Sequence, residues 1–200
     1  MKQATISDPI HYMNSVLMEQ FAIDLSQWPE LSAHISLLDL KESDHWFRAG
    51  DYCHDFAFIT SGLLRLYYVN EEGKEVIEGF YERDRLLGPI SAFVSDSPCP
   101  FYVQALEDTR LVTINHKQFT ELSNRQPKLL KFQVELLQSL FLHNAKRDAK
   151  RILCNGEQRY QWFCREYPHL IDRVAQYHIA SFLRMTPVNL SRLRKRLAQD

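Results

Sequence analysis

The sequence predicts an α+β fold: an N-terminal β-roll with flanking helices, a long dimerisation helix and a C-terminal helix-turn-helix. Three observations predict it. Residues 45–115 hold short aromatic and β-branched segments bounded by Gly, Asp, Asn or Pro, as strands are. A long helical pattern follows from Pro127 to about Asn155. Residues 178–200 combine a further helical pattern with a turn and a cluster of cations.

The composition is that of a folded domain with free thiols. Of the 200 residues, 45% are hydrophobic and 24% are charged, so the chain can bury a core. No stretch approaches the roughly 18 apolar residues of a membrane span, and the polar start lacks the layout of a signal peptide. We therefore expect a cytoplasmic protein without a membrane partner. The four cysteines form no CxxC pair, and we expect them to be free.

The formal net charge of -1 hides a division between two parts of the chain. Residues 1–125 contain 10 Lys and Arg against 19 Asp and Glu, a net charge of -9. Residues 126–200 contain 14 against 6, a net charge of +8. Such asymmetry indicates two parts with different partners, and the basic part is suited to a polyanion.

The N-terminal pattern predicts two helical segments before the strands. Apolar residues between Ile10 and Leu25 recur close to every 3.6 residues, which predicts a helix over 9–25. A second short helical segment is expected around Glu30–Leu38, after "QWP".

The middle of the chain predicts at least five strands, namely "DFAFITSG", "LLRLYYVN", "KEVIEGFY", "PFYVQALE" and "RLVTIN". The loop "NEEGKE" joins the second and third of them as a hairpin, with Gly73 suited to a positive φ. No helix is expected between the strands to support a parallel sheet. A β-barrel or β-roll follows.

The segment from Pro127 to about Asn155 carries two apolar stripes, which indicates a helix covered on two sides. One stripe alternates by four and three, as in a coiled-coil seam, and is expected to pair with a second subunit. Its members are Leu130, Val134, Leu137, Phe141 and Asn144. The other stripe could face the β-part, and it consists of Leu129, Phe132, Leu136 and Leu140. The alternative is a helix buried wholly within its own monomer.

The last segment satisfies the internal requirements of a helix-turn-helix. Ala180 is the small residue that lets the second helix pass close to the first. Thr186 is suited to cap the second helix, and Pro187 to be its first residue. Arg184 stands in the turn, where Gly is usual because φ tends to be positive, at a cost of about 1 kcal/mol. The internal contacts are expected from Ile179, Leu183, Met185, Leu190 and Leu193.

The polar face of the second helix has the side chains that a major-groove helix requires. Arg can bond the two acceptors of guanine, while Ser, Lys and the helix N-terminus can hold phosphates. The candidate DNA-binding residues are Arg184, Thr186, Val188, Asn189, Ser191, Arg192, Lys195 and Arg196. The alternative is an amphipathic helix whose cationic face is simply solvated.

Three stretches carry a resemblance to a known family: "SGLLRLYYVNEEGKEVIEGF", "ALEDTRLVTI" and "IASFLRMTPVNLSRLRK". They resemble the hairpin, the last strands and the DNA-reading unit of the Crp/Fnr family of bacterial transcription regulators. The resemblance implies a double-stranded β-helix like the cyclic-nucleotide-binding domain over 1–125, a dimerisation helix over 126–153 and a DNA-binding domain over 154–200. It implies a homodimer on a two-fold symmetric operator, with RNA polymerase as a candidate partner. The DNA-binding part is expected to lack a β-hairpin wing, since 167–173 is too short for one.

The family's cyclic-AMP clamp is only partly present. Its Phe-Gly-Glu stretch, which supplies a carboxylate to the ribose, corresponds to Leu87, Gly88 and Pro89 here. Its Arg and following hydroxyl, which clamp the phosphate, correspond to Cys99 and Pro100. Burying a phosphate without a strong donor is costly, so we expect no cyclic-AMP binding in the usual mode.

Other effector chemistry stays open, and both the effector and any cofactor are unknown. Arg83 and Arg85 precede the loop that contains Leu87, Gly88 and Pro89. They could replace the missing phosphate-binding Arg only if that loop were rearranged. A haem-type sensor would need an axial ligand such as His45 or Cys53, although both read more simply as polar residues at a strand edge. We further expect the β-roll to bias a hinge around Asn155–Gly156 that sets the distance between two recognition helices.

Two other functions are alternatives to DNA-dependent regulation. A metal-dependent enzyme on the β-barrel would need clustered ligands, but the eight histidines are scattered without an HxH or ExxH pair. We expect no enzymatic activity and no metal site. The other rival is a cyclic-nucleotide-binding sensor module that acts through protein contacts without DNA.

Overall fold

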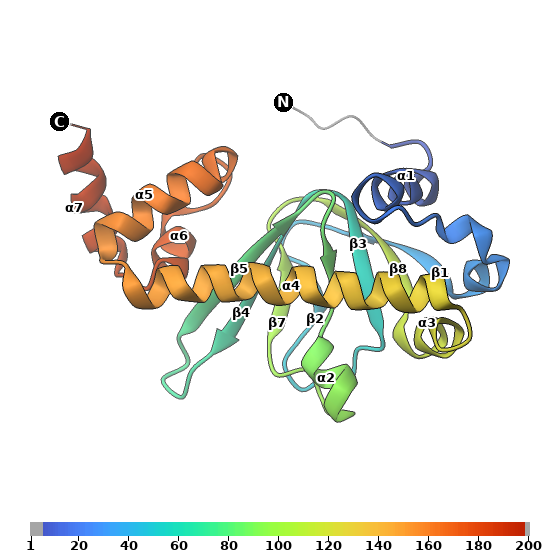
Figure 1. Cartoon of the computed structure of the whole chain (residues 1–200). Helices are drawn as coiled ribbons and strands as arrows, with labels where there is room; N and C mark the ends of the chain where they lie inside the picture. The colour runs from blue at the N-terminus through green and yellow to red at the C-terminus, as the bar shows by residue number, and fades with distance from the viewer. Residues whose placement is uncertain (1–5, 199–200) are drawn as a thin grey trace. The chain divides into compact units, whose positions relative to one another are not determined.

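The computed structural model describes residues 6–198, which divide into two compact units (Figure 1). Unit 1 consists of residues 6–68 and 79–137, and unit 2 of residues 69–78 and 138–198. The long helix α4 (Pro127–Leu153) contributes to both units, and the tip of a hairpin, 69–78, groups with the C-terminal part. No helix among these residues is long and apolar enough to cross a membrane.

The first helix, α1 (Pro9–Phe21), is shorter than predicted. Asp8 caps its start by accepting hydrogen bonds from the amides of Ile10 and His11. The predicted end at Leu25 is wrong, because Ala22 adopts a left-handed conformation with φ 53° that ends the helix. Two 3₁₀ turns follow, Leu25–Gln27 and Pro29–His34.

The predicted helical segment up to Leu38 is also wrong beyond His34. Residues Ile35–Leu40 form strand β1, which pairs antiparallel with β8 (Thr109–Asn115) from Ile35↔Ile114 to Leu40↔Thr109. The pairing with a strand some seventy residues later decides the conformation here, and no local pattern reports it.

The five predicted strands are confirmed, and they belong to two four-stranded sheets. The first sheet has the order β1-β8-β3-β6 and the second has the order β2-β7-β4-β5. The confirmed strands are β3 (Asp55–Ser61), β4 (Leu63–Val69), β5 (Glu75–Glu82), β7 (Tyr102–Ala105) and β8. Two short strands were missed, β2 (His45–Phe47) and β6 (Leu86–Leu87). The pairings described between these strands are antiparallel, so the prediction that no helix supports a parallel sheet is confirmed. The short helix α2 (Ile90–Ser95) lies between β6 and β7, which belong to different sheets.

Unit 1 contains two hydrophobic cores. One core lies where α1, the two 3₁₀ turns, α3 (His116–Ser123) and the first half of α4 pack on the outside of the first sheet, with Phe58, Phe119 and Phe132 among its members. The other core fills the β-roll, with Phe47, Phe101 and Cys99 among its members. Each core residue is withdrawn from water, so both cores contribute hydrophobic stabilisation.

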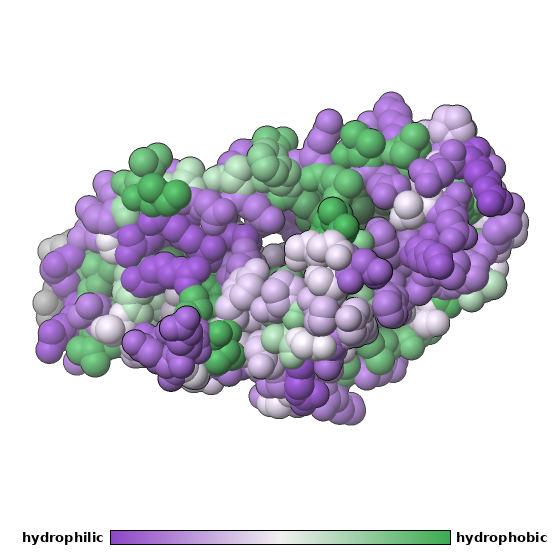
Figure 2. Space-filling view, turned by 90° about the horizontal axis from the view of Figure 1, so that it is seen from below, coloured by the Kyte–Doolittle hydropathy of each residue, from purple (hydrophilic) through white to green (hydrophobic). Residues whose placement is uncertain are grey.

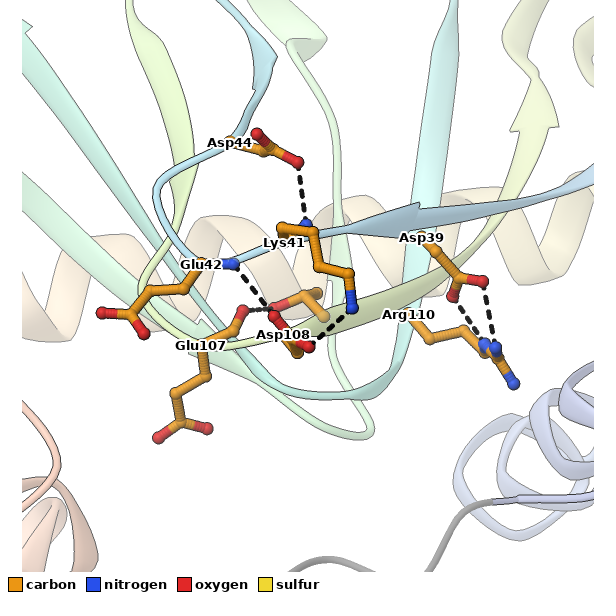
Figure 3. A network of polar contacts seen from close by, with 8 residues as sticks. Asp39, Lys41, Glu42, Asp44, Glu107, Asp108 and Arg110 are labelled. Carbon is orange, nitrogen blue, oxygen red and sulfur yellow. Dashed lines mark hydrogen bonds and ion pairs between the residues drawn. The ribbon is translucent and has the colours of Figure 1, made fainter.

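A polar network fixes one end of the paired strands β1 and β8 (Figure 3). Arg110 donates two hydrogen bonds to Asp39, at 2.6 and 2.9 Å. Lys41 donates to Asp108 at 2.9 Å, and the Asp108 carboxylate also accepts the amide of Glu42. The first of these pairs lowers the pKa of Asp39, mainly through the hydrogen bond from Arg110. The network orders the turn that leads from β1 to β2.

Gly62, between β3 and β4, meets a close approach that only glycine allows. Its φ is +97°, and a Cβ built there would lie 2.6 Å from the Thr109 Cα and 2.7 Å from the Asp108 carbonyl oxygen. Both neighbours are backbone atoms and cannot rotate away. The predicted positive φ of Gly73, in the hairpin loop, is also confirmed at +76°.

The two predicted stripes of α4 have different surroundings. Leu129 and Phe132 are buried, and together with Leu136 they pack into the core of unit 1, as the second stripe predicts. The other stripe, which is predicted to pair with a second subunit, is exposed in the single chain. Phe141, for example, keeps 72% of its surface accessible.

Unit 2 places three helices around a small aromatic and aliphatic core. They are α5 (Gly156–Glu166), α6 (Gln176–Phe182) and α7 (Pro187–Leu197). The break predicted at 155–158 is confirmed: α4 ends at Leu153, and Asn155 and Gln158 form a reciprocal capping box that begins α5. A 3₁₀ turn, Pro168–Leu170, stands in the segment predicted to be too short for a wing. The core residues include Phe163, Leu170, Ile179, Ala180, Phe182, Leu183 and Leu190.

Candidate nucleic-acid interface

The helix-turn-helix is built as the sequence predicts. Ala180 is fully buried between its neighbours, so α7 can approach α6 closely. The Thr186 side chain accepts a hydrogen bond from the Asn189 amide at 3.2 Å, and Pro187 is the first residue of α7. These two features fix where the helix begins and leave its first turn pointing away from the core.

The turn between α6 and α7 has Arg184 in the left-handed conformation, with φ 56°. The Arg184 amide donates to the Ser181 carbonyl oxygen, and the Met185 amide donates to that of Ala180, both at 3.0 Å. This pair of hydrogen bonds is the Schellman arrangement, in which glycine normally holds the left-handed position. The chain therefore accepts a strained arginine at a point where its side chain is exposed.

The candidate DNA-binding residues gather on the exposed surface of α7 and the turn before it. Seven of the eight are exposed, and Ser191 is half-buried. Leu190 and Leu193, on the opposite side of the same helix, are buried. The helix thus has one apolar face that holds it and one polar face that is free to meet a partner.

The electrostatics of this face favour a polyanion. Among the described residues, Arg184, Arg192 and Lys195 make no ion pair within the chain. Arg196 instead pairs with Glu157 of α5 at 2.5 Å. Cations without an internal partner keep their charge available for phosphate oxygens.

A cleft of about 1040 Å³ lies beside this face, entirely within unit 2. Residues 74–77 of the hairpin tip line it from one side, and the starts of α5 and α7 line it from others. The candidate DNA-binding residues Arg184, Thr186, Asn189, Arg192 and Arg196 are among its lining.

The hairpin tip is held against α6 by one side chain. The Ile77 amide donates to the Ser181 hydroxyl oxygen at 3.0 Å, and that hydroxyl donates to the Glu75 carbonyl oxygen at 3.2 Å. Since β5 is an edge strand of its sheet, Ser181 satisfies two backbone groups that have no neighbouring strand.

Two arginines of α4 reinforce the same attachment. Arg147 is 3% exposed and forms an ion pair with the Glu78 carboxylate. Arg151 donates to the Glu78 carbonyl oxygen, and its guanidinium lies 5.0 Å from the centre of the Phe182 ring. A buried arginine is tolerated only where its charge is paired, so Glu78 and Arg147 depend on each other.

The candidate effector-pocket residues have different surroundings. Leu87 and Cys99 are buried in the core that fills the β-roll, Pro89 is buried and Gly88 is half-buried. Pro100 and Arg85 are exposed. Arg83 donates to the Tyr12 hydroxyl at 2.7 Å and lies over its ring, which engages it with α1.

The two residues considered as haem ligands have other surroundings. His45 shares a hydrogen bond of 2.9 Å with the Tyr67 hydroxyl. Burial raises the pKa of the Cys53 thiol to about 12, which disfavours the thiolate that a metal would need. Within residues 6–198, no three His, Cys, Asp or Glu side chains gather closely enough to hold a metal ion.

The candidate dimer residues form an exposed apolar row on α4. Leu130, Val134 and Leu137 keep 40–46% of their surface accessible. Asn144 is exposed and accepts a hydrogen bond from Arg147 at 3.0 Å. Figure 2 shows hydrophobic groups in green scattered over a surface that is mostly hydrophilic.

Sequence reasoning missed the residues that complete the cleft from outside the recognition helix. They are Lys74, Arg159, Tyr177 and Ser181, of which Tyr177 is 59% exposed. Its exposed ring, within the first helix of the helix-turn-helix, was the one local signal that could have drawn attention to Tyr177.

Comparison with known families and curated proteins finds regulators. Residues 37–126 match the family described as cyclic nucleotide-binding domain. The chain is 29% identical over 128 residues to the "Fumarate and nitrate reduction regulatory protein" of Vibrio cholerae, covering 62% of this chain and 49% of that protein. It is 27% identical over 174 residues to the "Anaerobic regulatory protein" of Pasteurella multocida, covering 79% of this chain and 61% of that protein. The chain thus spans about half to three fifths of the length of these relatives.

Comparison with solved structures finds the same fold. FixK2 from Bradyrhizobium japonicum matches with a TM-score of 0.73 at 12% identity, over 82% of this chain and 85% of that one. The regulator CLP of Xanthomonas campestris, described as c-di-GMP responsive, matches with a TM-score of 0.72 at 14% identity. The match covers 88% of this chain and 93% of that one. At these identities the likeness concerns the fold.

Proposed function

The chain belongs to the Crp/Fnr family of regulators, and from that membership we propose that it is a homodimeric, DNA-binding transcription regulator. The observation that carries the proposal is the capped helix α7, whose exposed face holds cations without an internal partner. In this role α7 enters the major groove, with Arg192 on base edges and Lys195 on the phosphate backbone. The protein would act in the cytoplasm without enzymatic activity of its own.

The dimer is proposed from the exposed row on α4. Leu130, Val134, Leu137 and Phe141 repeat by four and three, the spacing at which two helices interdigitate. A second copy would cover them and place two α7 helices on one operator. RNA polymerase is the proposed partner of the DNA-bound dimer.

For the β-roll we propose that cyclic AMP is not bound in the family's usual mode. The positions of the missing clamp, Cys99 and Pro100, offer neither a cation nor a hydroxyl, and Cys99 is 1% exposed inside a packed core. Titration of the full chain with cyclic AMP should give no saturable heat at concentrations that saturate a cyclic-AMP receptor.

Binding to duplex DNA across a range of salt concentrations tests the proposed function. Affinity should fall steeply with salt, because several phosphate contacts displace counterions. Arg192→Ala, which removes the side chain assigned to base edges, should weaken binding roughly fivefold or more, whereas Lys195→Ala, which removes a phosphate contact, should reduce the salt slope by about 1. Arg165→Ala, which removes an exposed arginine from α5, is the matched control and should leave affinity nearly unchanged. A flat salt response, or equal losses in Arg192→Ala and Arg165→Ala, contradicts DNA binding through α7.

A further inference from the structure

Val188 presents an apolar side chain on the exposed face of α7. Its surface is 56% accessible, whereas Leu190 and Leu193 of the same helix are buried in the core of unit 2. Single exposed apolar residues are common on protein surfaces, so exposure alone assigns Val188 no role. What distinguishes this valine is its place on a helix face that also carries exposed cations.

The start of α7 fixes the position of Val188. Thr186 accepts the Asn189 amide at 3.2 Å and Pro187 is the first helical residue, so Val188 is the second. The N-terminal residues of a recognition helix are those that reach base edges in the major groove. A β-branched side chain in a helix has one strongly preferred rotamer, so Val188 holds its two methyl groups in a defined direction. It therefore loses little rotamer freedom when it makes a contact.

Val188 and Arg192 lie one helical turn apart on the same side of α7. Residues at i and i+4 are neighbours on a helix surface, with their Cβ atoms about 5–6 Å apart. Arg192 is exposed, and the proposed function assigns it to base edges. Four residues rise about 6 Å along a helix, which is close to two base-pair steps of about 3.4 Å each. Val188 therefore meets a base within about two base pairs of the one that Arg192 contacts.

Thymine offers the apolar group that this side chain fits. In the major groove adenine, guanine and cytosine present hydrogen-bond donors and acceptors, whereas thymine also presents its C5-methyl group. A valine packed against a donor or an acceptor would withdraw that group from water without a hydrogen bond, which disfavours the other three bases. The modified base 5-methylcytosine carries a methyl group at the same C5 position and offers the same contact.

We propose that Val188 packs against the methyl group of a thymine in each half of the operator, and that 5-methylcytosine can take the place of this thymine. The thymine lies within about two base pairs of the guanine that Arg192 reads. The inference rests on the proposed function, because it requires α7 in the major groove. The same contact makes occupancy of a site respond to cytosine methylation at this position.

Replacing thymine by uracil in a bound duplex tests the contact, because uracil lacks only the methyl group and forms the same base pair. Each thymine of a duplex selected from random sequences is replaced in turn, and the affinity is measured by fluorescence anisotropy at constant salt. Loss of one buried methyl contact should weaken binding about threefold at one thymine position of each half-site. In Val188→Ala the same replacement should have no effect.

Val94→Ala is the matched control, because it makes the same change at an exposed valine of α2 in unit 1. It should show the full loss of affinity when the thymine is replaced by uracil. Val188→Thr keeps the β-branched shape and one methyl group, and should retain part of the discrimination between thymine and uracil.

Methylation is tested in the same duplex by changing the identified thymine to cytosine and then to 5-methylcytosine, each paired with guanine. Cytosine should weaken binding by the unmodified chain, and the added methyl group should restore about threefold of the affinity. Val188→Ala should bind the cytosine and 5-methylcytosine duplexes equally well.

Two sets of outcomes separate this inference from the proposed function. If no thymine loses its uracil effect in Val188→Ala, or if 5-methylcytosine binds no better than cytosine, the inference is overturned while DNA binding through α7 stands. Absence of DNA binding, or DNA binding that Arg192→Ala leaves unchanged, would refute the proposed function and the inference with it.

Discussion

Arg184 combines a strained backbone conformation with an exposed positive charge. A side chain in the left-handed region costs about 1 kcal/mol, and the Schellman hydrogen bonds around Arg184 hold it there. The residue also lines the cleft and faces solvent without an ion pair among the described residues. A cation at this position therefore comes at the expense of stability.

Arg184→Gly should separate these two effects. Glycine relieves the strain, so the free energy of unfolding should rise by about 1 kcal/mol in urea titrations. The lost cation should weaken DNA binding and lower its salt slope by about 1. Arg184→Lys is the control that keeps both strain and charge. A variant Arg184→Gly that is no more stable than the parent would refute the argument from strain.

His116 provides a pH dependence at the residue scale. Burial lowers its pKa from the usual 6.5, and its ring is stacked on Phe93 with 4.1 Å between centres. The unfolded chain therefore takes up this proton at a higher pH than the folded chain. The free energy of unfolding should fall as the pH drops through 6.5 and level off below the folded pKa.

Chemical denaturation at a series of pH values measures this effect, and His116→Gln should flatten the dependence in that window. Following the ring signals of His116 by NMR gives the folded pKa directly. A value at or above 6.5 would contradict the assigned effect of burial.

At the scale of elements, helix α4 has one buried and one exposed stripe. Its first half packs Leu129 and Phe132 into unit 1, and the row from Leu130 to Phe141 faces solvent. An isolated chain gains nothing from this row, because apolar side chains in water provide no burial energy. A second helix would recover that energy.

Leu137→Glu should therefore prevent dimerisation without unfolding the chain. A carboxylate in the middle of the seam would be desolvated by a partner helix, so sedimentation should show a shift from dimer to monomer. Gln138→Glu introduces the same charge next to the seam and should leave the dimer intact. A dimer that survives Leu137→Glu would place the interface elsewhere.

Elements differ in how far their own residues determine them. The helix-turn-helix was predicted residue by residue because Ala180, Thr186 and Pro187 act within a few positions of one another. Strand β1 was read as helix because its conformation depends on β8. The cleft was missed for the same reason: Ile77 and Ser181, which attach the hairpin to α6, stand 104 residues apart.

For the whole molecule, the charge is divided between an acidic and a basic part. If the chain binds DNA as proposed, the net charge of +8 in residues 126–200 would attract it to the phosphate backbone, and the net charge of -9 in residues 1–125 would oppose indiscriminate binding to polyanions. A homodimer would present two copies of α7 related by a two-fold axis.

Selection of bound sequences from random duplexes should therefore recover inverted repeats. Their half-site centres should lie about one helical turn apart, roughly 34 Å. Sequencing of the selected pool measures both the symmetry and the spacing. Bound sites without two-fold symmetry would contradict a dimer that reads DNA through two α7 helices.

The Ser181 hydroxyl also covers part of an open strand edge. It occupies an amide and a carbonyl group on the outer side of β5, where the sheet has no further strand. Any state in which α6 leaves the hairpin exposes a template for strand addition by another molecule. Conditions that release the helix-turn-helix from the hairpin in concentrated solution should therefore also promote slow aggregation through this edge.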